Sequence, residues 1–321
     1  MHFALPPRKT SHPPPYALPA RSNPTRGRNP LHYIGGIAVF LIIVFLLRGG
    51  FSGGGSQVDS KQGVVIVTMF DRSTMSEGYI KKIKQNREDY ALRHGYGTFY
   101  TDASDYKYKY ENHPASWGMI PSMRHAFKNH TDIEYIWQLS AHSLILNPEL
   151  SLHEQILKDE RISSIMLRDL PVVPPDSVIH TFSHLSPDRV SMIISQDHEG
   201  LSATSIILRN DDWSQFCLDV WFDPLMISYN FQKAEVHALE HIIQWHPTIL
   251  AQVAVIPQKA FNSYAVDVPN AKGQGLYADG DFVVTLNECG AHGESRNCEK
   301  EMDPYFRLWV KTIEIRKKQV V

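Results

Sequence analysis

The chain has 321 residues, of which 43% are hydrophobic and 21% are charged. A sequence of this length and composition can bury a substantial core, which excludes disorder along the whole chain. The 32 Lys and Arg residues are balanced by 34 Asp and Glu residues. This balance provides no basic field for gathering phosphates and argues against a nucleic acid as the partner.

The N-terminal part differs in composition from the rest. Residues 1–30 are rich in proline and arginine without apolar periodicity, which predicts a disordered cytosolic tail. Residues 31–47 are an apolar run long enough, as a helix, to cross a thin bilayer as a transmembrane signal anchor. Basic residues concentrate before this run, so the positive-inside rule places the following residues in the lumen, as in a type II membrane protein. A signal peptide is the alternative, although no convincing small-residue cleavage site follows.

Residues 48–62 are rich in Gly and Ser, which predicts a flexible stem that keeps residues 63–321 close to the membrane. A short span favours the thinner membranes of the Golgi or the endoplasmic reticulum. In a lumenal domain, Asn129 of "NHT" can accept an N-glycan on an exposed loop. The oxidising lumen allows Cys289 and Cys298 to form a disulfide, whereas the apolar neighbours of Cys217 predict a buried free thiol.

Predicted strands and helices alternate from residue 63 onward. The first five elements are a strand at 63–70, a helix ending at Gly95, a strand at 98–103, a helix at 116–130 and a strand at 135–141. Further strands are predicted at 190–195, 204–210 and 280–286, and further helices at 212–223, 233–246 and 305–321. This order predicts an α/β fold with a doubly wound, mixed or mostly parallel sheet covered by helices on both faces. Ligands bind such sheets at the carboxyl ends of the strands, where "SAH" follows the third strand.

Eight stretches of the chain resemble, in the same order, the fungal galactosyl- and mannosyltransferases of glycosyltransferase family 34. They include "NREDYALRHGY", "SWGMIPSMRHAF", "YIWQLSAHSLILNP" and "QDHEGLSATSIILRN". The stretch "NFQKAEVHALEHIIQWHPTIL" is most similar to a subunit of the fungal Golgi α-1,6-mannosyltransferase complex. The resemblance implies a GT-A fold, GDP-mannose as donor, an N-glycan outer-chain acceptor and other mannosyltransferase subunits as partners. A galactose donor remains open, because the family divides between the two sugars.

The resemblance also implies a divalent cation such as Mn²⁺, held by two carboxylates one residue apart at a strand end, which stabilises the departing diphosphate. The matching residues of this chain are Ser140, Ala141 and His142. Serine and alanine supply no negative oxygen, so only His142 could contact the metal, and imidazole suits Mn²⁺ less well than carboxylate does. We therefore expect a weakened metal site.

Three other positions depart from the family pattern in the same direction. Met119 stands where the family commonly has a lysine, which removes a possible phosphate partner. Thr204 stands where the family has a glycine, so a β carbon occupies a place that favours close backbone approach. Thr285 stands where the family has a histidine, so a second metal ligand is in doubt.

The stretch "QDHEGL" retains the family pattern, and the resemblance makes Gln196 and Asp197 candidates for contacting the reacting sugar and the acceptor. In a retaining transfer the departing phosphate can accept the acceptor's proton, so Asp197 would orient the acceptor hydroxyl and stabilise positive charge on the sugar. A loop aspartate that caps the next element is the alternative. Thr68, Asp71 and Arg87 are candidate donor contacts, although an exposed loop and a solvated helix face explain them equally well.

The stretch "HALEH" places His237 and His241 one helical turn apart, with Glu240 between them. The zinc-protease signature has glutamate directly after its first histidine, and alanine stands there in this chain. Three functions therefore remain open: an active glycosyltransferase subunit, a catalytically silent scaffold that docks an active partner, and a metal-dependent hydrolase.

Overall fold

The computed structural model of the protein describes residues 63–107, 112–174, 177–266, 272–287, 289 and 296–319. The predicted tail at 1–30, anchor at 31–47 and stem at 48–62 lie outside these residues. Within the described part of the chain, no helix combines the length and apolar character needed to cross a bilayer.

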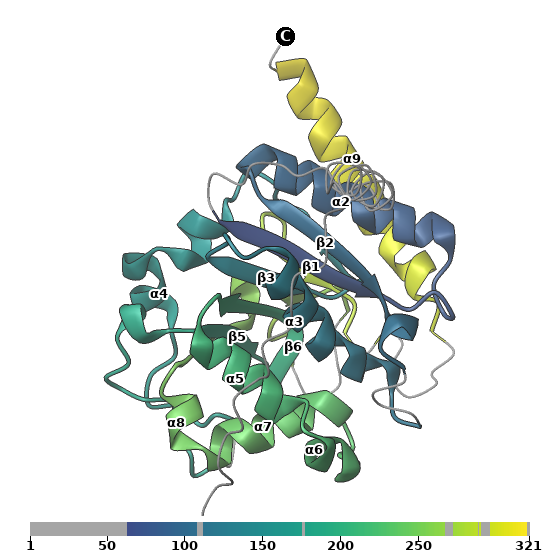
Figure 1. Ribbon diagram of the computed structural model, residues 1–321. Helices are drawn as coiled ribbons and strands as arrows, with labels where there is room; N and C mark the ends of the chain where they lie inside the picture. The colour runs from purple at the N-terminus through teal and green to yellow at the C-terminus, as the bar shows by residue number, and fades with distance from the viewer. Residues whose placement is uncertain are drawn as a thin grey trace, which may run out of the picture. The chain divides into compact units, whose positions relative to one another are not determined.

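A six-stranded mixed sheet forms the centre of the fold, with strand order β2-β1-β3-β6-β5-β7 (Figure 1). Its strands are β1 (Val64–Phe70), β2 (Gly97–Asp102), β3 (Tyr135–Leu139), β5 (Met192–Gln196), β6 (Leu201–Arg209) and β7 (Val253–Pro257). β6 is antiparallel to both of its neighbours, β3 and β5, and the other paired strands are parallel. The prediction of a mixed α/β sheet is confirmed, with β6 as its antiparallel strand.

A second, three-stranded sheet begins with the strand that follows β3 in the chain. It contains β4 (Ser143–Ile145), β9 (Val283–Thr285) and β8 (Ser263–Tyr264), in the order β4-β9-β8. Ser143 pairs with Thr285 across the antiparallel β4 and β9. The small sheet therefore brings the segment after β3 together with residues from the last quarter of the chain.

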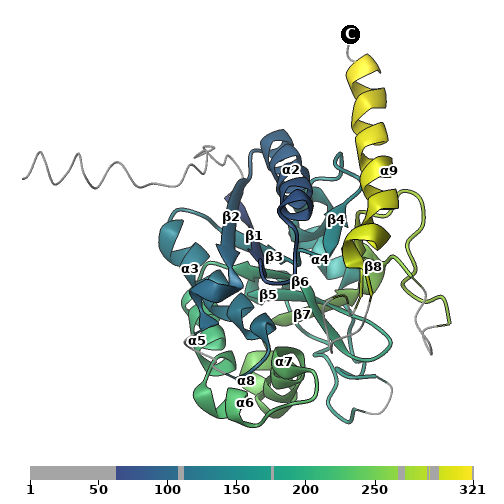
Figure 2. The same cartoon turned by 90° about the vertical axis from the view of Figure 1, so that its right-hand side faces the viewer.

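Helices cover both faces of the large sheet (Figure 2). They are α2 (Glu77–His94), α3 (Met119–Asn129), α4 (Asp159–Ile165), α5 (Asp212–Trp221), α6 (Pro224–Ser228), α7 (Ala234–Trp245), α8 (Pro247–Leu250) and α9 (Cys298–Gln319). One-turn elements lie at Ala103–Asp105, Ala115–Gly118, His153–Leu157, Pro187–Arg189 and Gln258–Ala260. Because successive strand residues point to opposite faces, the buried strands read as continuous apolar runs.

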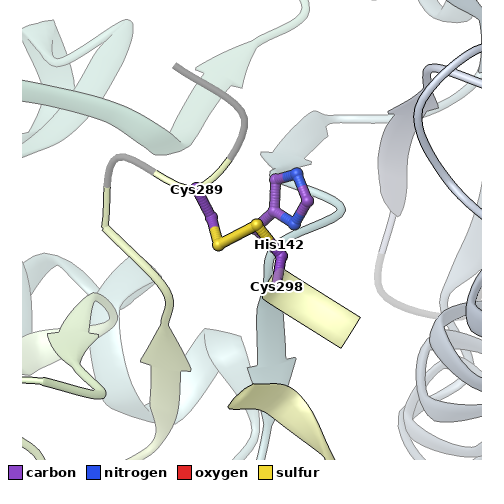
Figure 3. A group of neighbouring side chains, drawn as sticks. All are labelled: His142, Cys289 and Cys298. Carbon is purple, nitrogen blue, oxygen red and sulfur yellow. A yellow bond between two sulfur atoms is a disulfide. The ribbon is translucent and has the colours of Figure 1, made fainter. Parts of the chain in front are cut away.

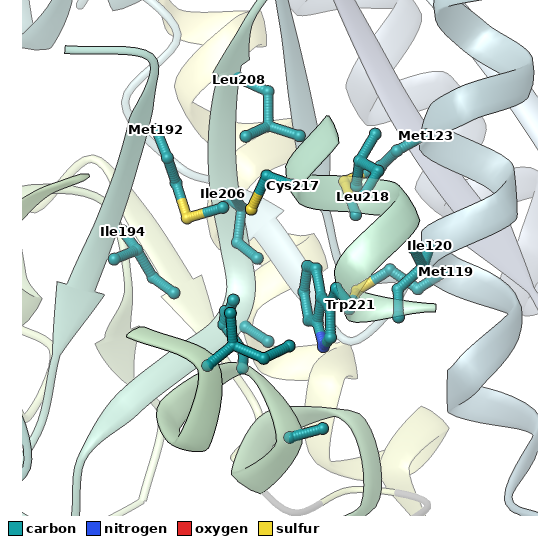
Figure 4. Packing of buried hydrophobic residues seen from close by; sticks show 14 of the residues in the cluster. Met119, Ile120, Met123, Met192, Ile194, Ile206, Leu208, Cys217, Leu218 and Trp221 are labelled. Atoms are coloured by element: carbon teal, nitrogen blue, oxygen red, sulfur yellow. The ribbon is translucent and has the colours of Figure 1, made fainter. Parts of the chain in front are cut away.

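Each face of the sheet has its own hydrophobic core. Val65 and Val67 of β1 share one core with residues of α3, α5 and α7, and Val64 and Ile66 share the other with residues of α2 and α4. Figure 4 shows the first core, in which Met119 and Ile120 of α3 lie beside Trp221 of α5. Met119 is only 7% exposed, so its side chain belongs to the core. Methionine fills apolar space at that position, and the expectation that position 119 marks a lost phosphate contact stays a prediction.

Local signals explain the accurate prediction of α2. The hydroxyl of Ser76 accepts a hydrogen bond from the backbone N–H of Tyr79 at 3.1 Å, which caps the first turn. The helix ends at Gly95, whose φ of 71° is left-handed and favours glycine. These two residues set the length of the helix that follows β1.

The C-terminal helix is longer than predicted. The prediction began at residue 305, whereas α9 begins at Cys298 and continues through Pro304. Met302, Phe306 and Trp309 pack with Ile80 and Ile83 of α2 in a third core. The first turn of α9 is fixed by a disulfide between Cys289 and Cys298, whose Cα atoms are 5.8 Å apart.

Candidate active site

The turn after β3 lies at the carboxyl end of the strand, where a donor site was predicted. The backbone N–H of Ser140 donates to the carbonyl of Thr204 on β6 at 2.8 Å. The hydroxyl of Ser140 accepts the backbone N–H of His142 at 3.2 Å, and Ser143 N–H donates to the Ser140 carbonyl at 3.0 Å. Ser140 therefore caps its own turn, as serine often does.

Arg87 of α2 binds the backbone of this turn from the interior of the fold. Its side chain is fully buried, and one guanidinium nitrogen donates to the carbonyls of Ser140 at 3.0 Å and Ser143 at 2.8 Å. The other terminal nitrogen donates to the Asn86 side chain at 2.6 Å, and Asn86 in turn pairs with the backbone of Ile145. Burial lowers the pKa of Arg87 to about 10, which leaves it charged at neutral pH. The predicted donor contact is corrected, because the guanidinium faces backbone carbonyls inside the fold.

Thr68 and Asp71 flank the end of β1. Thr68 is fully buried and donates its hydroxyl to the carbonyl of Leu139 at 3.0 Å. It therefore joins β1 to β3, and the prediction that it contacts the donor is corrected for the same reason as for Arg87. Asp71 is half-buried in the turn after β1, and its carboxylate accepts the backbone N–H of Ser73 at 3.0 Å. Asp71 is thus the one of the three predicted donor contacts that is partly exposed to solvent, and its role stays a prediction.

Asn262 is the centre of a buried network of neutral side chains. Its carbonyl oxygen accepts the hydroxyls of Thr204 and Thr285, each at 2.7 Å. Its amide nitrogen donates to Ser202 at 2.7 Å and to Ser195 at 3.3 Å. Asn262 is fully buried, so the protein itself uses both groups of the amide. The predicted positions Thr204 and Thr285 are thus brought together, through a residue that the sequence analysis did not single out.

His142 packs against the Cys289–Cys298 disulfide (Figure 3). Its Nδ1 lies 3.3 Å from the hydroxyl of Tyr79, which also donates to the Ala141 carbonyl at 3.2 Å. Burial lowers the pKa of His142 to about 4, and the nearby charge of Arg296 acts in the same direction. His142 is therefore neutral at physiological pH.

These residues do not fit a Mn²⁺ centre. Around Ser140, the described side chains that meet are hydroxyls and an amide, and no carboxylate is among them. His142, Cys289 and Cys298 have potential ligand atoms within 4.8 Å of one another, the one such group of three that the described residues contain. Both sulfur atoms are consumed in the disulfide and cannot act as thiolate ligands. Mn²⁺ prefers oxygen ligands with negative charge, so we derive no reaction step through a metal.

Gln196 and Asp197 lie at the end of β5 and begin the turn to β6. The Gln196 amide nitrogen donates to the carbonyls of Pro171 at 2.6 Å and Val172 at 2.8 Å. One oxygen of Asp197 accepts the N–H groups of Glu199 at 2.8 Å and Gly200 at 3.0 Å. Its other oxygen accepts the hydroxyl of Tyr264 on β8. The Asp197 carboxylate is therefore held by the turn on one side and by the small sheet on the other.

The histidines of "HALEH" do not form a zinc site in the structure. Glu240 accepts the N–H of Leu201 at 2.9 Å, and His237 accepts the N–H of Lys233 at 3.3 Å. His241 lies in a row of aromatic rings, 5.7 Å from Phe231 between ring centroids. The three side chains are not among the groups of potential metal ligands in the described part of the chain, so their geometry does not support the hydrolase hypothesis.

The structure places the remaining predicted residues as follows. Cys289 and Cys298 are joined as proposed, and Cys217 is a buried free thiol. Burial raises the pKa of Cys217 to about 12, so it is unreactive. Asn129 is exposed at the end of α3, and its glycosylation stays a prediction.

Comparison with known proteins gives a consistent family. Residues 60–296 match the model of the galactosyl transferase GMA12/MNN10 family. The chain is 34% identical over 261 residues to an uncharacterised alpha-1,2-galactosyltransferase, C8D2.17, of Schizosaccharomyces pombe, a match that covers 78% of this chain and 76% of that protein. It is 30% identical over 243 residues to the alpha-1,2-galactosyltransferase of the same yeast, covering 74% of this chain and 63% of that protein. It is 28% identical over 289 residues to the probable alpha-1,6-mannosyltransferase MNN11 of Saccharomyces cerevisiae, covering 82% and 67%.

Proposed function

Because the chain belongs to the galactosyl transferase GMA12/MNN10 family, we propose that it transfers a hexose from a nucleotide-diphosphate sugar to a hydroxyl of a glycan. The observation that carries this proposal is the turn after β5, in which the carboxylate of Asp197 is fixed at the carboxyl end of the large sheet. Asn262 links β5 to the segment after β3, because it bonds Ser195 and also Thr204, whose backbone carbonyl accepts the N–H of Ser140.

In this reaction, the acceptor oxygen forms a bond to the anomeric carbon while the bond from that carbon to the diphosphate oxygen breaks. The acceptor's proton passes to the departing diphosphate. Asp197 needs no proton of its own in this scheme, because its negative charge stabilises the positive charge that develops on the sugar ring. Its three hydrogen bonds hold the carboxylate in place before the substrate arrives.

Two donors are candidates. Galactose is the first, because the two galactosyltransferases match with 34% and 30% identity, above the 28% of the mannosyltransferase. Mannose from GDP-mannose, with an N-glycan mannan acceptor, is the second, because the mannosyltransferase match covers 82% of the chain. Incubation of the purified chain with UDP-galactose or GDP-mannose and an α-mannoside acceptor distinguishes them. Product with one donor identifies the sugar, and no product with either donor or their mixture contradicts catalysis.

A catalytically silent scaffold is the alternative that a specific observation favours. The Asn262 network satisfies its own hydrogen bonds and supplies no carboxylate to a metal. Calorimetric titration with GDP and UDP, each with and without Mn²⁺, tests this alternative. Binding of either nucleotide supports a retained donor site, and absence of binding up to millimolar concentration supports the scaffold.

The chain's location and partners are part of the same proposal. The apolar run at residues 31–47 and the basic residues before it support a Golgi, type II anchor with the glycosyltransferase domain in the lumen. The similarity to a probable α-1,6-mannosyltransferase supports assembly with other mannosyltransferase subunits. Pull-down of the tagged full chain from detergent-solubilised membranes, with hexosyltransferase activity assayed in the eluate, tests complex membership.

A further inference from the structure

Glu240 is a buried carboxylate on α7 that contacts the turn between β5 and β6. It is 9% exposed, and its Oε1 accepts the backbone N–H of Leu201, the first residue of β6, at 2.9 Å. A Cβ atom built on Gly200 would lie 2.0 Å from the same oxygen. Glycine at position 200 therefore allows the carboxylate to approach the backbone directly.

The same turn contains the Asp197 carboxylate. Asp197 N–H donates to the Gly200 carbonyl at 2.8 Å, which closes the turn, and Asp197 accepts the Gly200 N–H at 3.0 Å. Gly200 is thus bonded to Asp197 on one side and in contact with Glu240 on the other. A second contact comes from Lys233, the residue before α7, whose ion pair with Glu199 reaches the exposed part of the turn.

We propose that Glu240 is a positioning residue that holds the Asp197–Gly200 turn through the Leu201 N–H and so fixes Asp197 for hexosyl transfer. This role rests on the proposed function for its catalytic consequence, whereas the contact itself exists independently of any substrate. Glu240 does not touch the reacting atoms; it acts through Gly200 and Leu201.

The electrostatic surroundings make this contact sensitive to pH. Burial raises the pKa of Glu240 to about 7, and the negative charges of Asp197 and Glu199 act in the same direction. The Leu201 N–H and the Lys233 ammonium oppose these effects. On α7 itself, His237 Nε2 lies 4.0 Å from Glu240 Oε2. An ionised carboxylate is the stronger acceptor, so the hold on Leu201 strengthens as the pH rises through 7.

The Leu201 amide reports this contact without any assay of activity. We expect its ¹⁵N–¹H signal, in the leucine-labelled full chain in detergent micelles, to shift with a midpoint near pH 7. Glu240→Gln, which keeps an acceptor oxygen but cannot ionise, should abolish that midpoint. Glu235→Gln is the matched control, because Glu235 is a second buried carboxyl of α7 with a pKa raised to about 7, and it accepts a hydrogen bond from Ser116 instead. A Leu201 signal that titrates identically in the wild type and Glu240→Gln overturns the contact.

The pH profile of kcat separates positioning from a merely structural role. With an ionisation near pH 7, kcat of the wild type and of Glu235→Gln should fall by up to about tenfold from pH 8 to pH 6. Glu240→Gln should show a flat profile with little change in KM. An unchanged profile in Glu240→Gln, in an enzyme that turns over, overturns the positioning role. If the wild type shows no turnover while its Leu201 signal titrates as expected, the proposed function is contradicted and the Glu240 contact is not.

Discussion

The guanidinium of Arg87 donates to the carbonyl oxygens of Ser140 and Ser143, and so one buried charge supports both ends of the turn that follows β3. A residue on α2 thereby fixes the backbone at the centre of the candidate site. Because the guanidinium is fully buried and donates to backbone carbonyls, we expect this contact to contribute more to stability than an exposed ion pair does.

Arg87→Leu should lower the free energy of unfolding by about 3–5 kcal/mol, because it removes the guanidinium donor from the buried Ser143 carbonyl and from the Asn86 side chain and leaves the Ser140 carbonyl only the Ser143 N–H. Urea denaturation followed by fluorescence measures this loss. Arg93→Ala on the same helix is the control: Arg93 pairs with Glu149 near the surface, and its loss should cost at most about 1 kcal/mol. Equal effects of the two substitutions would show that Arg87 does not support the turn.

Ser140→Asp alone should not create a Mn²⁺ site. An aspartate can accept the His142 N–H as Ser140 does, so the turn should persist, but the neighbouring Thr285 and Asn262 remain neutral. Calorimetric titration with Mn²⁺ should therefore detect no binding tighter than about millimolar. The double variant Ser140→Asp/His142→Asp, which restores two carboxylates one residue apart, is the comparison. Tight binding and full turnover by the single variant would contradict this account of the site.

Glu235 and Glu240 predict how stability depends on pH. Burial raises the pKa of each to about 7, above the ordinary value of 4.5, so the folded chain binds more protons than the unfolded chain between these values. Their contribution to stability is fully present below pH 4.5 and is lost as the pH rises through 7, by about 3 kcal/mol for each carboxyl.

Urea denaturation at pH 5, 6, 7 and 8 checks this dependence. The stability of the wild type relative to Glu235→Gln should decrease between pH 5 and pH 7 and then become level. The same should hold relative to Glu240→Gln. A difference that stays constant across this range would mean that the two carboxyls titrate normally.

Replacing Cys289 and Cys298 together by serine should lower the free energy of unfolding by about 2–3 kcal/mol. The disulfide closes a short loop with a sequence separation of 9, and its loss frees that loop in the unfolded chain. Dithiothreitol should destabilise the wild type by a similar amount and leave the double variant unchanged. Detection of three free thiols in the denatured, unreduced wild type would disprove the bond.

The sequence was sufficient to predict the strands and helices whose signals are local. The β-branched run of β1 and the cap at Gly95 are examples, because each depends on neighbouring residues alone. β4 and β8 were not predicted: each is at most three residues long and pairs with β9, which is distant in the chain. β7 was also missed, although "VAVIP" is a buried apolar run next to β5.

The candidate site was predicted less well than the fold. Gln196 and Asp197 were located at the end of a strand, but Asn262, Tyr264 and Glu240 acquire their roles through contacts with residues far away in the chain. Arg87 and Thr68 were expected to face a ligand, and only the burial of their polar atoms shows that they bind the backbone. Sequence position alone does not distinguish a charge that faces solvent from one that supports a turn.

β6 is antiparallel to both β3 and β5, so this one strand sets the spacing between the Asp197 turn and the Ser140 turn. Its first residue follows the turn of Asp197, and three residues later Thr204 binds the backbone of Ser140. A single inserted residue early in β6 would shift the Asp197 turn by one residue relative to the Ser140 turn. It would also move the side chains of the shifted part of the strand to the opposite face of the sheet. Changes of donor or acceptor preference should therefore arise by exchange of side chains around this strand, while the length of the hairpin stays fixed.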